Sequence, residues 1–382
     1  MKLLKVGVFG TSRKKQEKRV PIHPQQLEWV DEEVRKCLVF EEGYGVRFGM
    51  EDEELAALSG GVASRETLFA ESDIVLLAKP IQADFDEMRE GTIHWGWPHC
   101  VQQNAITQTA IDKKLTLIAW EAMHRWSRNG DWQMHIFHKN NEIAGYAGVY
   151  HAMNLAGIDG NYGPNRKAVV ISFGSVSRGA IRALQARGIN DITVFTQRHY
   201  FLVADQMAGV NYFQFEADEE GNLTSIRPDN QSHSFYEELA DADIIVNGIL
   251  QDTDKPLMFV PEDKNHVLKQ GCLIVDVSCD EGMGFSFAKP TNFEEPMFKA
   301  GKVDYYAVDH TPSYLWNGAS WEISNSLLPY LPLIMEGPER WAKSETIRRA
   351  IEIQEGVIQN PKILSFQNRS EEYPHLVSSN QN

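Results

Sequence analysis

Short apolar runs alternate with segments of helical spacing over the first 120 residues of the chain. The runs at 4–9, 37–42, 74–79, 92–97 and 115–120 predict strands, and the spacing of apolar residues at 24–37 and 102–113 predicts helices. Such alternation is typical of an α/β domain, in which helices cover a mostly parallel sheet. We therefore predict an α/β architecture for this part of the chain.

A second series of strands and helices follows a long helical segment. Residues 143–157 are rich in Ala, Gly and aromatic side chains at helical spacing, which predicts a helix that packs closely against a neighbour and links two domains. Beyond it, strands are expected at 167–171, 191–195, 243–246, 272–277 and 305–308, and helices at 178–187 and 200–208. The apolar, helix-like run that continues to about residue 353 is expected to pack back on the first domain.

Two polar segments interrupt this order. Residues 123–141 contain Asn129-Gly130, which is typical of tight hairpin turns, so we expect a hinge or an edge hairpin there. Residues 216–234 are charged and rich in turn residues, which predicts a surface loop or hairpin. His135 and His138 lie in an alternating run of the first segment, so we interpret them as structural residues and expect no metal site.

Composition indicates a globular protein with two domains. The 382 residues suffice for two cores, because single cores rarely grow beyond about 250–300 residues. A formal net charge of −16 disfavours nucleic acid and anionic membranes as partners. The sequence shows neither a signal peptide nor the roughly 20 apolar residues of a membrane helix. We therefore expect a cytoplasmic protein. The four cysteines form no C-x-x-C pair, so we expect them to be reduced.

The run from Ala168 to Ala180 predicts a strand that turns abruptly into a helix. A dinucleotide fold places its pyrophosphate at such a turn. Gly174 leaves room for backbone N–H groups to approach the phosphates, and Ser175 and Val176 follow it, so these three residues are candidate cofactor contacts. Ser172 replaces the usual first glycine of the fingerprint. On this motif alone, a glycine-containing turn without a ligand is the alternative.

The end of the next strand bears on the choice of cofactor. NAD-binding folds usually place an acidic residue there, which binds the adenosine ribose. Here strand 191–195 is followed by Thr196-Gln197-Arg198, without an acid. Because Arg198 and its polar neighbours are suited to hold a 2′-phosphate, we expect NADP, with NAD as the alternative if Arg198 is only a solvated loop residue.

Eight motifs in order carry a family resemblance. They are Glu17-Lys18-Arg19-Val20-Pro21, Glu41-Glu42-Gly43-Tyr44-Gly45, Ala78-Lys79-Pro80, Gly96-Trp97-Pro98-His99, Ala144-Gly145-Tyr146-Ala147-Gly148-Val149, Asp243-Ile244-Ile245-Val246-Asn247-Gly248-Ile249, Val275-Asp276-Val277-Ser278-Cys279-Asp280 and Asp309-His310-Thr311-Pro312-Ser313. Over roughly 6–331 the chain resembles the alanine dehydrogenase and transhydrogenase superfamily. Within it, the chain is most similar to the N5-(carboxyethyl)ornithine synthase and lysine-forming saccharopine dehydrogenase branches.

This resemblance implies two Rossmann-like α/β domains with a cleft between them. The nucleotide domain is inserted between the two parts of the substrate domain. We expect the substrate domain to comprise residues 1–140 and 306–382, and the NAD(P)-binding domain residues 141–305. A homo-oligomer is also expected.

The resemblance implies roles for four residues in the chemistry. Arg19 and Lys79 correspond to residues that bind the carboxylate and the carbonyl of a 2-oxo acid, and His99 corresponds to the catalytic histidine. Asp280 corresponds to the aspartate that closes the site from the nucleotide domain. The chemistry agrees, because an anionic oxo acid needs a fixed cation and a donor at its developing oxyanion, and imidazole exchanges protons near neutral pH.

Three further residues are implied to contact the cofactor: Asn247, Gly248 and His310. His310 stands where alanine dehydrogenases carry asparagine, and it matches saccharopine dehydrogenases instead. Glu121, at the end of strand 115–120, either orients a substrate amine or forms a structural ion pair. We leave it outside the catalytic set.

The function expected from these residues is an NAD(P)H-dependent reductive condensation. A 2-oxo acid, with pyruvate favoured, would join the amino group of an amino acid of the ornithine or lysine type. Alanine dehydrogenase, saccharopine dehydrogenase and the soluble subunit of a transhydrogenase are alternatives from the same superfamily. A non-catalytic NADP-binding sensor is the alternative from another class, and Ser172 motivates it.

Overall fold

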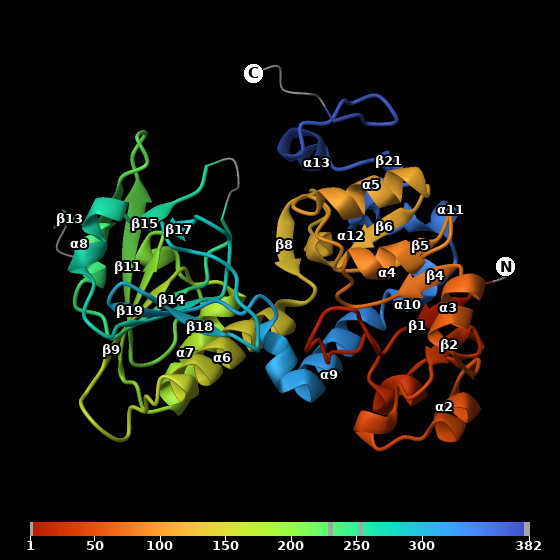
Figure 1. The fold of residues 1–382 in the computed structure, drawn as a ribbon, viewed down its shortest axis with the longest axis horizontal. Helices are drawn as coiled ribbons and strands as arrows, with labels where there is room; N and C mark the ends of the chain where they lie inside the picture. Colours follow the sequence, from red (N-terminus) through yellow and green to blue (C-terminus); the bar gives the residue numbers. More distant parts are fainter. Residues whose placement is uncertain (1–2, 228–231, 252–254, 378–382) are drawn as a thin grey trace. The chain divides into compact units, whose positions relative to one another are not determined.

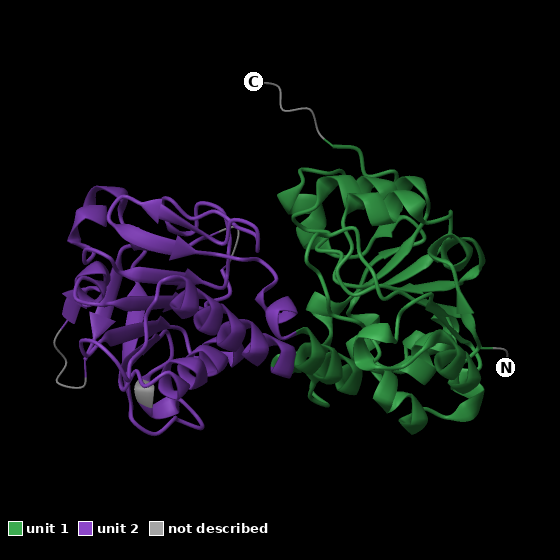
Figure 2. Ribbon diagram, turned by 60° about the horizontal axis from the view of Figure 1, so that its bottom comes forward, with its two compact units in different colours: residues 1–138, 316–382 green, residues 139–315 purple. Residues whose placement is uncertain are grey.

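A computed structural model describes residues 3–227, 232–251 and 255–377, and the chain forms two compact units (Figures 1 and 2). The first unit comprises residues 1–138 and 316–382, and the second comprises residues 139–315. The domain boundary predicted after residue 305 differs from the one in the structure, because residues 306–315 belong to the second unit. They are held there in part by Thr311, whose Oγ1 donates a hydrogen bond to the Ala144 carbonyl at 2.9 Å.

The first unit is built on an eight-stranded sheet of order β21-β20-β6-β5-β4-β1-β2-β3. The strands from β3 to β6 pair in parallel, and the return segment adds β20 and β21 antiparallel at the edge. The strands are β1 (Val6–Val8), β2 (Leu38–Glu41), β3 (Val62–Ala63), β4 (Ile74–Leu76), β5 (Ile93–Gly96), β6 (Thr116–Ala119), β20 (Ile351–Gln354) and β21 (Val357–Ile358). The helical segment expected to continue to about residue 353 is therefore wrong at its end, because β20 forms there and its isoleucines alternate with polar residues.

Helices of the first unit are short. They are α1 (Glu32–Arg35), α2 (Asp52–Leu58), α3 (Arg65–Glu71), α4 (Gln82–Glu87), α5 (Asn104–Asp112), α9 (Trp316–Leu327), α10 (Leu331–Met335), α11 (Pro338–Trp341), α12 (Glu345–Arg348) and α13 (Pro361–Phe366), with 3-10 helices η1 (Pro24–Trp29), η2 (Val46–Phe48) and η3 (Trp120–Ala122). The single helix expected at 24–37 is wrong, because Val30 adopts an extended conformation (φ −94°, ψ 135°) and separates η1 from α1.

The segment 123–141 contains the expected hairpin. Strands β7 (His124–Trp126) and β8 (Trp132–His135) pair antiparallel, and Gly130 takes the positive φ of +83° that the turn requires. His135 belongs to β8, where its Nε2 lies 3.2 Å from the Glu121 carbonyl oxygen. His138 departs from the expected alternating run, because it begins helix α6 (His138–Leu155).

The second unit is built on a nine-stranded sheet of order β13-β12-β11-β10-β9-β14-β16-β19-β18. Its six inner strands, from β11 to β19, pair in parallel, and the outer strands pair antiparallel. The strands are β9 (Lys167–Ile171), β10 (Asp191–Thr196), β11 (Val210–Ala217), β12 (Leu223–Ile226), β13 (Ser232–Ser234), β14 (Ile244–Asn247), β16 (Leu273–Asp276), β18 (Met297–Ala300) and β19 (Val303–Tyr306). A separate parallel pair contains β15 (Met258–Val260) and β17 (Gly284–Phe285). Residues 216–234 form the expected hairpin from β11 to β12, apart from 228–231, which lie outside the described residues.

Helices of the second unit are α6, α7 (Ser175–Ala186) and α8 (Phe235–Leu239), with 3-10 helices η4 (Tyr200–Leu202), η5 (Glu262–Val267) and η6 (Thr311–Leu315). The helix expected at 200–208 is wrong. Only η4 forms there, because Asp205 takes a positive φ of +51°, which interrupts helical geometry. Phe201 and Leu202 are exposed, so the segment has no continuous apolar face.

Helices α6 and α7 approach closely through glycine, as the small residues of 143–157 predict. A Cβ atom on Gly145 would lie 1.8 Å from the Val176 carbonyl oxygen, and one on Gly179 would lie 1.7 Å from that of Glu142. No other residue fits at these two positions. The contact fixes the N-terminal turn of α7 beside α6.

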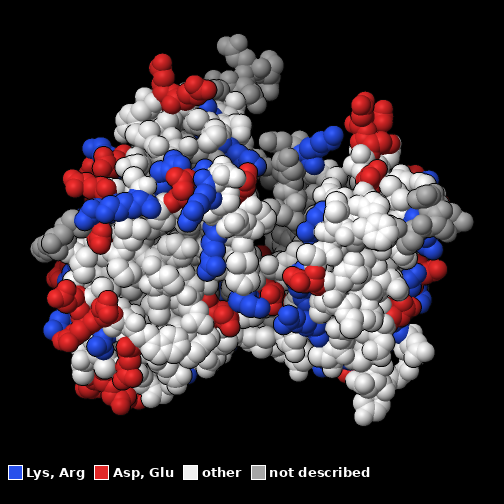
Figure 3. All heavy atoms as spheres, turned by 180° about the vertical axis from the view of Figure 1, so that it is seen from behind, with Lys and Arg blue, Asp and Glu red and all other residues white. Residues whose placement is uncertain are grey.

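On the face drawn in Figure 3, acidic and basic side chains are interspersed over both units. Within the described part of the chain, no helix is long and apolar enough to cross a membrane.

Candidate active site

In the first unit, three polar residues follow three neighbouring parallel strands. Lys79 comes after β4, His99 after β5 and Glu121 after β6. Ligand sites of open α/β sheets lie at the carboxyl ends of the strands, because loops from several strands meet there. The topology thus brings Lys79 and His99, which are separated by 20 positions in the sequence, to one edge of the sheet.

Lys79 and His99 are in direct contact. Lys79 Nζ lies 2.9 Å from His99 Nε2. The His99 backbone N–H donates to Glu121 Oε1 at 2.7 Å, and Nδ1 of the ring lies 3.8 Å from the same oxygen. His99 takes a positive φ of +50°, a conformation that costs energy for a residue with a Cβ and that often marks functional sites. Glu121, which sequence reasoning left out of the catalytic set, therefore belongs to this cluster.

Arg19 is buried, with 6% of its surface exposed, and is paired with Glu17. Its Nε and Nη2 atoms donate to the two Glu17 oxygens at 2.8 and 2.6 Å, which is the bidentate geometry of strong arginine–carboxylate pairs. The guanidinium carbon lies 5.0 Å from the centre of the Trp97 ring, and Trp97 precedes His99 by two residues. The Arg19–Glu17 ion pair is thus buried beside the end of β5.

A second buried acid, Glu352, lies on β20 and was missed from the sequence. The sequence signals the strand only, because Ile351 and Ile353 alternate with Glu352 and Gln354 as in a half-buried strand, a pattern that predicts a solvent-facing Glu352. Burial raises the pKa of Glu121, and the negative charge of Glu352 raises it further.

In the second unit, the strand-turn-helix from β9 to α7 has the geometry of a phosphate-binding turn. Ser172 takes a positive φ of +83°, so a serine adopts the left-handed conformation that glycine usually supplies. Gly174 is the N-cap of α7, and a Cβ there would meet no atom nearer than Ser172 Oγ at 3.9 Å. The space in front of Gly174, with Ser175 and Val176 starting the helix, fits a bound phosphate.

Thr196 ends β10 beside this turn, and Arg198 follows it by two residues. Thr196 is buried, and its Oγ1 accepts the Arg198 backbone N–H at 3.4 Å. Arg198 Nη2 donates to the Phe173 carbonyl oxygen at 3.1 Å, so the guanidinium lies against the residue between Ser172 and Gly174.

Asn247 and Gly248 end β14, next to β9 in the sheet. A Cβ on Gly248 would lie 2.6 Å from Ser177 Oγ, so only glycine permits this approach to α7. Asn247 is buried and donates to Asp276 Oδ1 at 3.0 Å. Asp276 also accepts the Tyr305 hydroxyl on Oδ2 at 2.6 Å and the Cys279 N–H on Oδ1 at 3.0 Å.

Asp280 and His310 follow β16 and β19. Asp280 is partly buried, and burial raises the pKa of its carboxyl. His310 is buried, and its Nδ1 lies 2.6 Å from Asp309 Oδ1. Its Nε2 is buried without a hydrogen-bond partner among the residues that the structure describes. An orphaned ring nitrogen at the carboxyl edge of the sheet suits a ligand contact.

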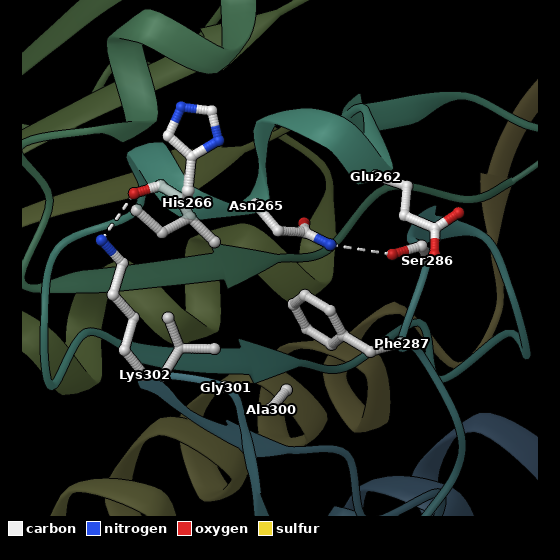
Figure 4. Close-up of a pocket in the computed structure, with 10 residues that line it drawn as sticks. Glu262, Asn265, His266, Ser286, Phe287, Ala300, Gly301 and Lys302 are labelled. Atoms are coloured by element: carbon white, nitrogen blue, oxygen red, sulfur yellow. Dashed lines mark hydrogen bonds between the residues drawn. The ribbon is translucent and has the colours of Figure 1, made fainter.

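One cavity of about 500 Å³ lies elsewhere in the second unit (Figure 4). Lys302 Nζ donates to the His266 carbonyl oxygen at 2.6 Å, and Asn265 Nδ2 donates to Ser286 Oγ at 3.0 Å. Because Gly301 and Lys302 precede β19, this cavity is at the amino ends of the strands. It is therefore distinct from the turn at Gly174.

Comparisons with known proteins identify the family and the fold. Two family models match: the N-terminal domain of alanine dehydrogenase/PNT over residues 11–144, and its C-terminal domain over residues 155–361. An N(5)-(carboxyethyl)ornithine synthase from Clostridium botulinum is 27% identical over 321 residues, which cover 81% of this chain and 88% of the relative. An alanine dehydrogenase from Mycobacterium tuberculosis is 24% identical over 342 residues, covering 86% of each chain.

A solved structure of an L-alanine dehydrogenase has the same fold. It superposes with a TM-score of 0.74 at 19% identity, and the match covers 95% of this chain and 99% of that one. The predicted two-domain α/β fold is thereby confirmed. The chain belongs to the alanine dehydrogenase/PNT family and is an NAD(P)-dependent oxidoreductase that acts on small molecules.

Proposed function

We propose that this enzyme condenses a 2-oxo acid, with pyruvate favoured, with the amino group of an ornithine- or lysine-type amino acid, and reduces the product to an N-carboxyalkyl amino acid. The contact between Lys79 Nζ and His99 Nε2 carries the proposal, because it joins a cation for the carbonyl oxygen to a group that exchanges protons. The resemblance to the N(5)-(carboxyethyl)ornithine synthase of Clostridium botulinum supports the choice of an amino acid over ammonia.

In this mechanism Arg19 binds the carboxylate of the oxo acid, and Glu17 holds its guanidinium in place. Lys79 polarises the carbonyl, which favours attack by the amine. His99 gives a proton to the hydroxyl that leaves as water when the imine forms. Asp280, whose pKa is raised by burial, positions the amine or the nicotinamide.

The reduced nicotinamide supplies the hydride when it is bound. The open space at Gly174 and the orphaned Nε2 of His310 fit this cofactor, with Ser175, Val176, Thr196, Asn247 and Gly248 as further contacts. Because Arg198 lies against the phosphate-binding turn, we propose NADP rather than NAD.

A substrate panel tests this function. Purified enzyme is incubated with NADPH, pyruvate or 2-oxoglutarate, and either ammonia or one amino acid, while nicotinamide absorbance is followed and products are identified by mass spectrometry. Oxidation that requires pyruvate and ornithine or lysine is expected. Turnover with ammonia and with no amino acid identifies an alanine dehydrogenase instead, and turnover confined to 2-oxoglutarate and lysine identifies a saccharopine dehydrogenase.

A further inference from the structure

The loop that carries His99 is held by a segment near the C-terminus. Residues 97–103 join β5 to α5, and His99 lies within them at a positive φ of +50°. Gln367 is the C-cap of α13 and is buried, with 9% of its surface exposed. Its Nε2 donates to the carbonyl oxygens of Cys100 and Val101 at 2.6 and 3.2 Å. A side chain from a distant part of the sequence thus binds the two residues that follow His99.

Arg369 fixes the orientation of the Gln367 amide. Arg369 is buried, and its Nε donates to Gln367 Oε1 at 2.7 Å. A guanidinium can only donate hydrogen bonds, so the amide oxygen must face Arg369 and the amide nitrogen must face the loop. Arg369 also donates to Gln108 Oε1 at 2.9 Å and to the side-chain oxygen of Asn104, both on α5. These contacts tie the amide to the helix that follows the loop.

Thr107 completes the contact from the side of α5. Its Oγ1 accepts a hydrogen bond from Gln367 Nε2 at 3.1 Å and donates one to the Cys100 carbonyl oxygen at 2.9 Å. Cys100 and Thr107 are fully buried. A buried carbonyl group without a donor is costly, so the protein itself must supply the donors here. Gln367 and Thr107 together supply both hydrogen bonds of the Cys100 carbonyl.

His99 is therefore held on both sides. Its backbone N–H donates to Glu121 Oε1 at 2.7 Å, and Gln367 binds the carbonyl groups that come after it. A residue with a Cβ keeps a positive φ only where its surroundings determine the backbone firmly. If the donors on the C-terminal side are lost, the turn can relax, and the His99 ring then moves away from Lys79.

We propose that Gln367 is a positioning residue for His99, because it holds the turn that keeps His99 Nε2 beside Lys79 Nζ. The match to the C-terminal family model ends at residue 361, so Gln367 and Arg369 lie in a part of the chain that the model does not cover. This inference rests on the function proposed for His99.

Two variants of Gln367 test the proposal in the full chain. Gln367→Glu keeps the length of the side chain and an acceptor for Arg369, but it has no N–H to donate to the loop. Gln367→Met keeps the approximate volume and adds no charge, so it decides the question if Gln367→Glu fails to fold. In both, kcat should fall about 10- to 100-fold, because a ring displaced by roughly 1 Å no longer meets the reacting group.

The pattern of kinetic constants separates positioning from a general loss of structure. Arg19 is held by Glu17, and the turn at Gly174 belongs to the second unit. The KM for pyruvate and the affinity for NADPH should therefore stay within about twofold of the wild type while kcat falls. Steady-state kinetics and calorimetry measure these constants.

Hydrogen–deuterium exchange tests the hold on the loop without any substrate. Amide groups of residues 99–103 should exchange about tenfold faster in both variants of Gln367, because local opening is no longer opposed by the amide of that residue. Mass spectrometry of peptides from this loop measures the rate.

Two control variants are matched to these changes. Gln359→Met makes the same replacement at an exposed glutamine of the same segment, whose Nε2 donates to the Val357 carbonyl oxygen at 3.1 Å. Ser64→Ala removes the N-cap of α3, where Ser64 Oγ accepts the Thr67 N–H at 3.2 Å, and so lowers the stability of the first unit at another place. Neither should change kcat or the exchange of residues 99–103.

Each other outcome overturns a stated part of the proposal. Unchanged exchange of the loop in both variants of Gln367 shows that this side chain does not hold it. Faster exchange with an unchanged kcat shows that the hold does not position His99. An equal loss of kcat in Ser64→Ala assigns Gln367 a role in stability alone. If the wild type turns over no substrate pair, the proposed function fails, while the exchange rates still decide whether Gln367 holds the loop.

Discussion

Asn247 donates a hydrogen bond to Asp276 across neighbouring strands, with 3.0 Å between Nδ2 and Oδ1. Asn247 ends β14 and Asp276 ends β16, so this bond ties together the carboxyl ends of two neighbouring strands. The Tyr305 hydroxyl and the Cys279 N–H bind the same carboxyl. Asp276 is thus the centre of a buried network that holds a proposed cofactor contact in place.

Asp276 makes stability depend on pH. Burial raises its pKa from an ordinary value of 3.8 to about 6, although its three hydrogen bonds oppose the shift. A carboxyl whose folded pKa is raised stabilises the fold below its unfolded pKa, and this stabilisation is lost as pH rises through the folded pKa. Between about pH 4 and pH 6 the wild type should therefore lose ~3 kcal/mol that Asp276→Asn does not lose. Denaturant unfolding of both proteins across this range measures the difference, and parallel profiles would contradict it.

Gly174→Ala tests where the pyrophosphate lies. Gly174 has φ −90° and ψ −170°, a backbone conformation that alanine also adopts. The added Cβ would have space, because the nearest protein atom, Ser172 Oγ, would lie 3.9 Å away. Stability should change by no more than about 0.5 kcal/mol. If a phosphate approaches this position, NADPH affinity should fall about tenfold or more, which calorimetry measures.

The control for Gly174→Ala is Gly318→Ala. Gly318 lies in α9 of the first unit, and a Cβ there has open space. It should leave NADPH affinity unchanged. If the two variants bind NADPH with equal affinity, the pyrophosphate does not lie at Gly174.

Arg198→Ala tests the preference for NADP. A guanidinium that binds a 2′-phosphate contributes about 1.5–3 kcal/mol, so NADPH affinity should fall roughly 10- to 100-fold while NADH affinity stays nearly constant. Arg178→Ala is the matched control, because Arg178 stacks 4.1 Å from the centre of the Phe173 ring and donates to the Ala204 and Asp205 carbonyl oxygens. The ratio of the two affinities should not change in that variant. A loss of both affinities in equal proportion in Arg198→Ala would assign Arg198 a structural role.

Strands were easier to predict from this sequence than helices. Most residues of strands β4, β5, β6, β9 and β10 are buried, on both faces of the sheet, as expected in a parallel sheet, and most of them are apolar. The segments at 24–37 and 200–208 also have apolar residues at helical intervals, yet local backbone geometry at Val30 and Asp205 divides or ends them. Periodicity carries no information on such single dihedral angles, and at 200–208 it also misplaced the buried face, since Phe201 and Leu202 are exposed.

The candidate site was predictable only where a residue follows a strand in a known motif. Lys79, His99 and Asn247 satisfy that condition. Glu352 does not, because its burial depends on the pairing of β20 with β6, between residues more than 230 positions apart. The ends of strands can be located from local sequence, whereas a contact made by a returning segment depends on the tertiary fold.

Arg19→Lys tests carboxylate binding. Lysine keeps the charge and loses the planar fork that pairs with Glu17 through Nε and Nη2, so the cation is no longer held in one orientation. The KM for the oxo acid should rise about tenfold or more, with a smaller effect on kcat, because the contact is made in ground state and transition state alike. Steady-state kinetics with varied pyruvate measures both constants. A KM that is unchanged while kcat falls would move Arg19 from substrate binding to the chemical step.

His99→Asn tests the proton transfer. Asparagine tolerates the positive φ of +50° at this position better than alanine, so the backbone N–H can still donate to Glu121. The variant lacks a group that exchanges protons near neutral pH, and kcat should fall about 10²- to 10⁴-fold.

The nucleotide turn supplies the internal control for His99→Asn. Gly174 and Arg198 belong to the second unit, whereas His99 belongs to the first, so NADPH affinity should equal that of the wild type. Full turnover in His99→Asn would remove this residue from the mechanism and leave Lys79, whose Nζ lies 2.9 Å from His99 Nε2, as the group to test. A parallel loss of NADPH affinity and kcat would instead show that the substitution disturbs the fold.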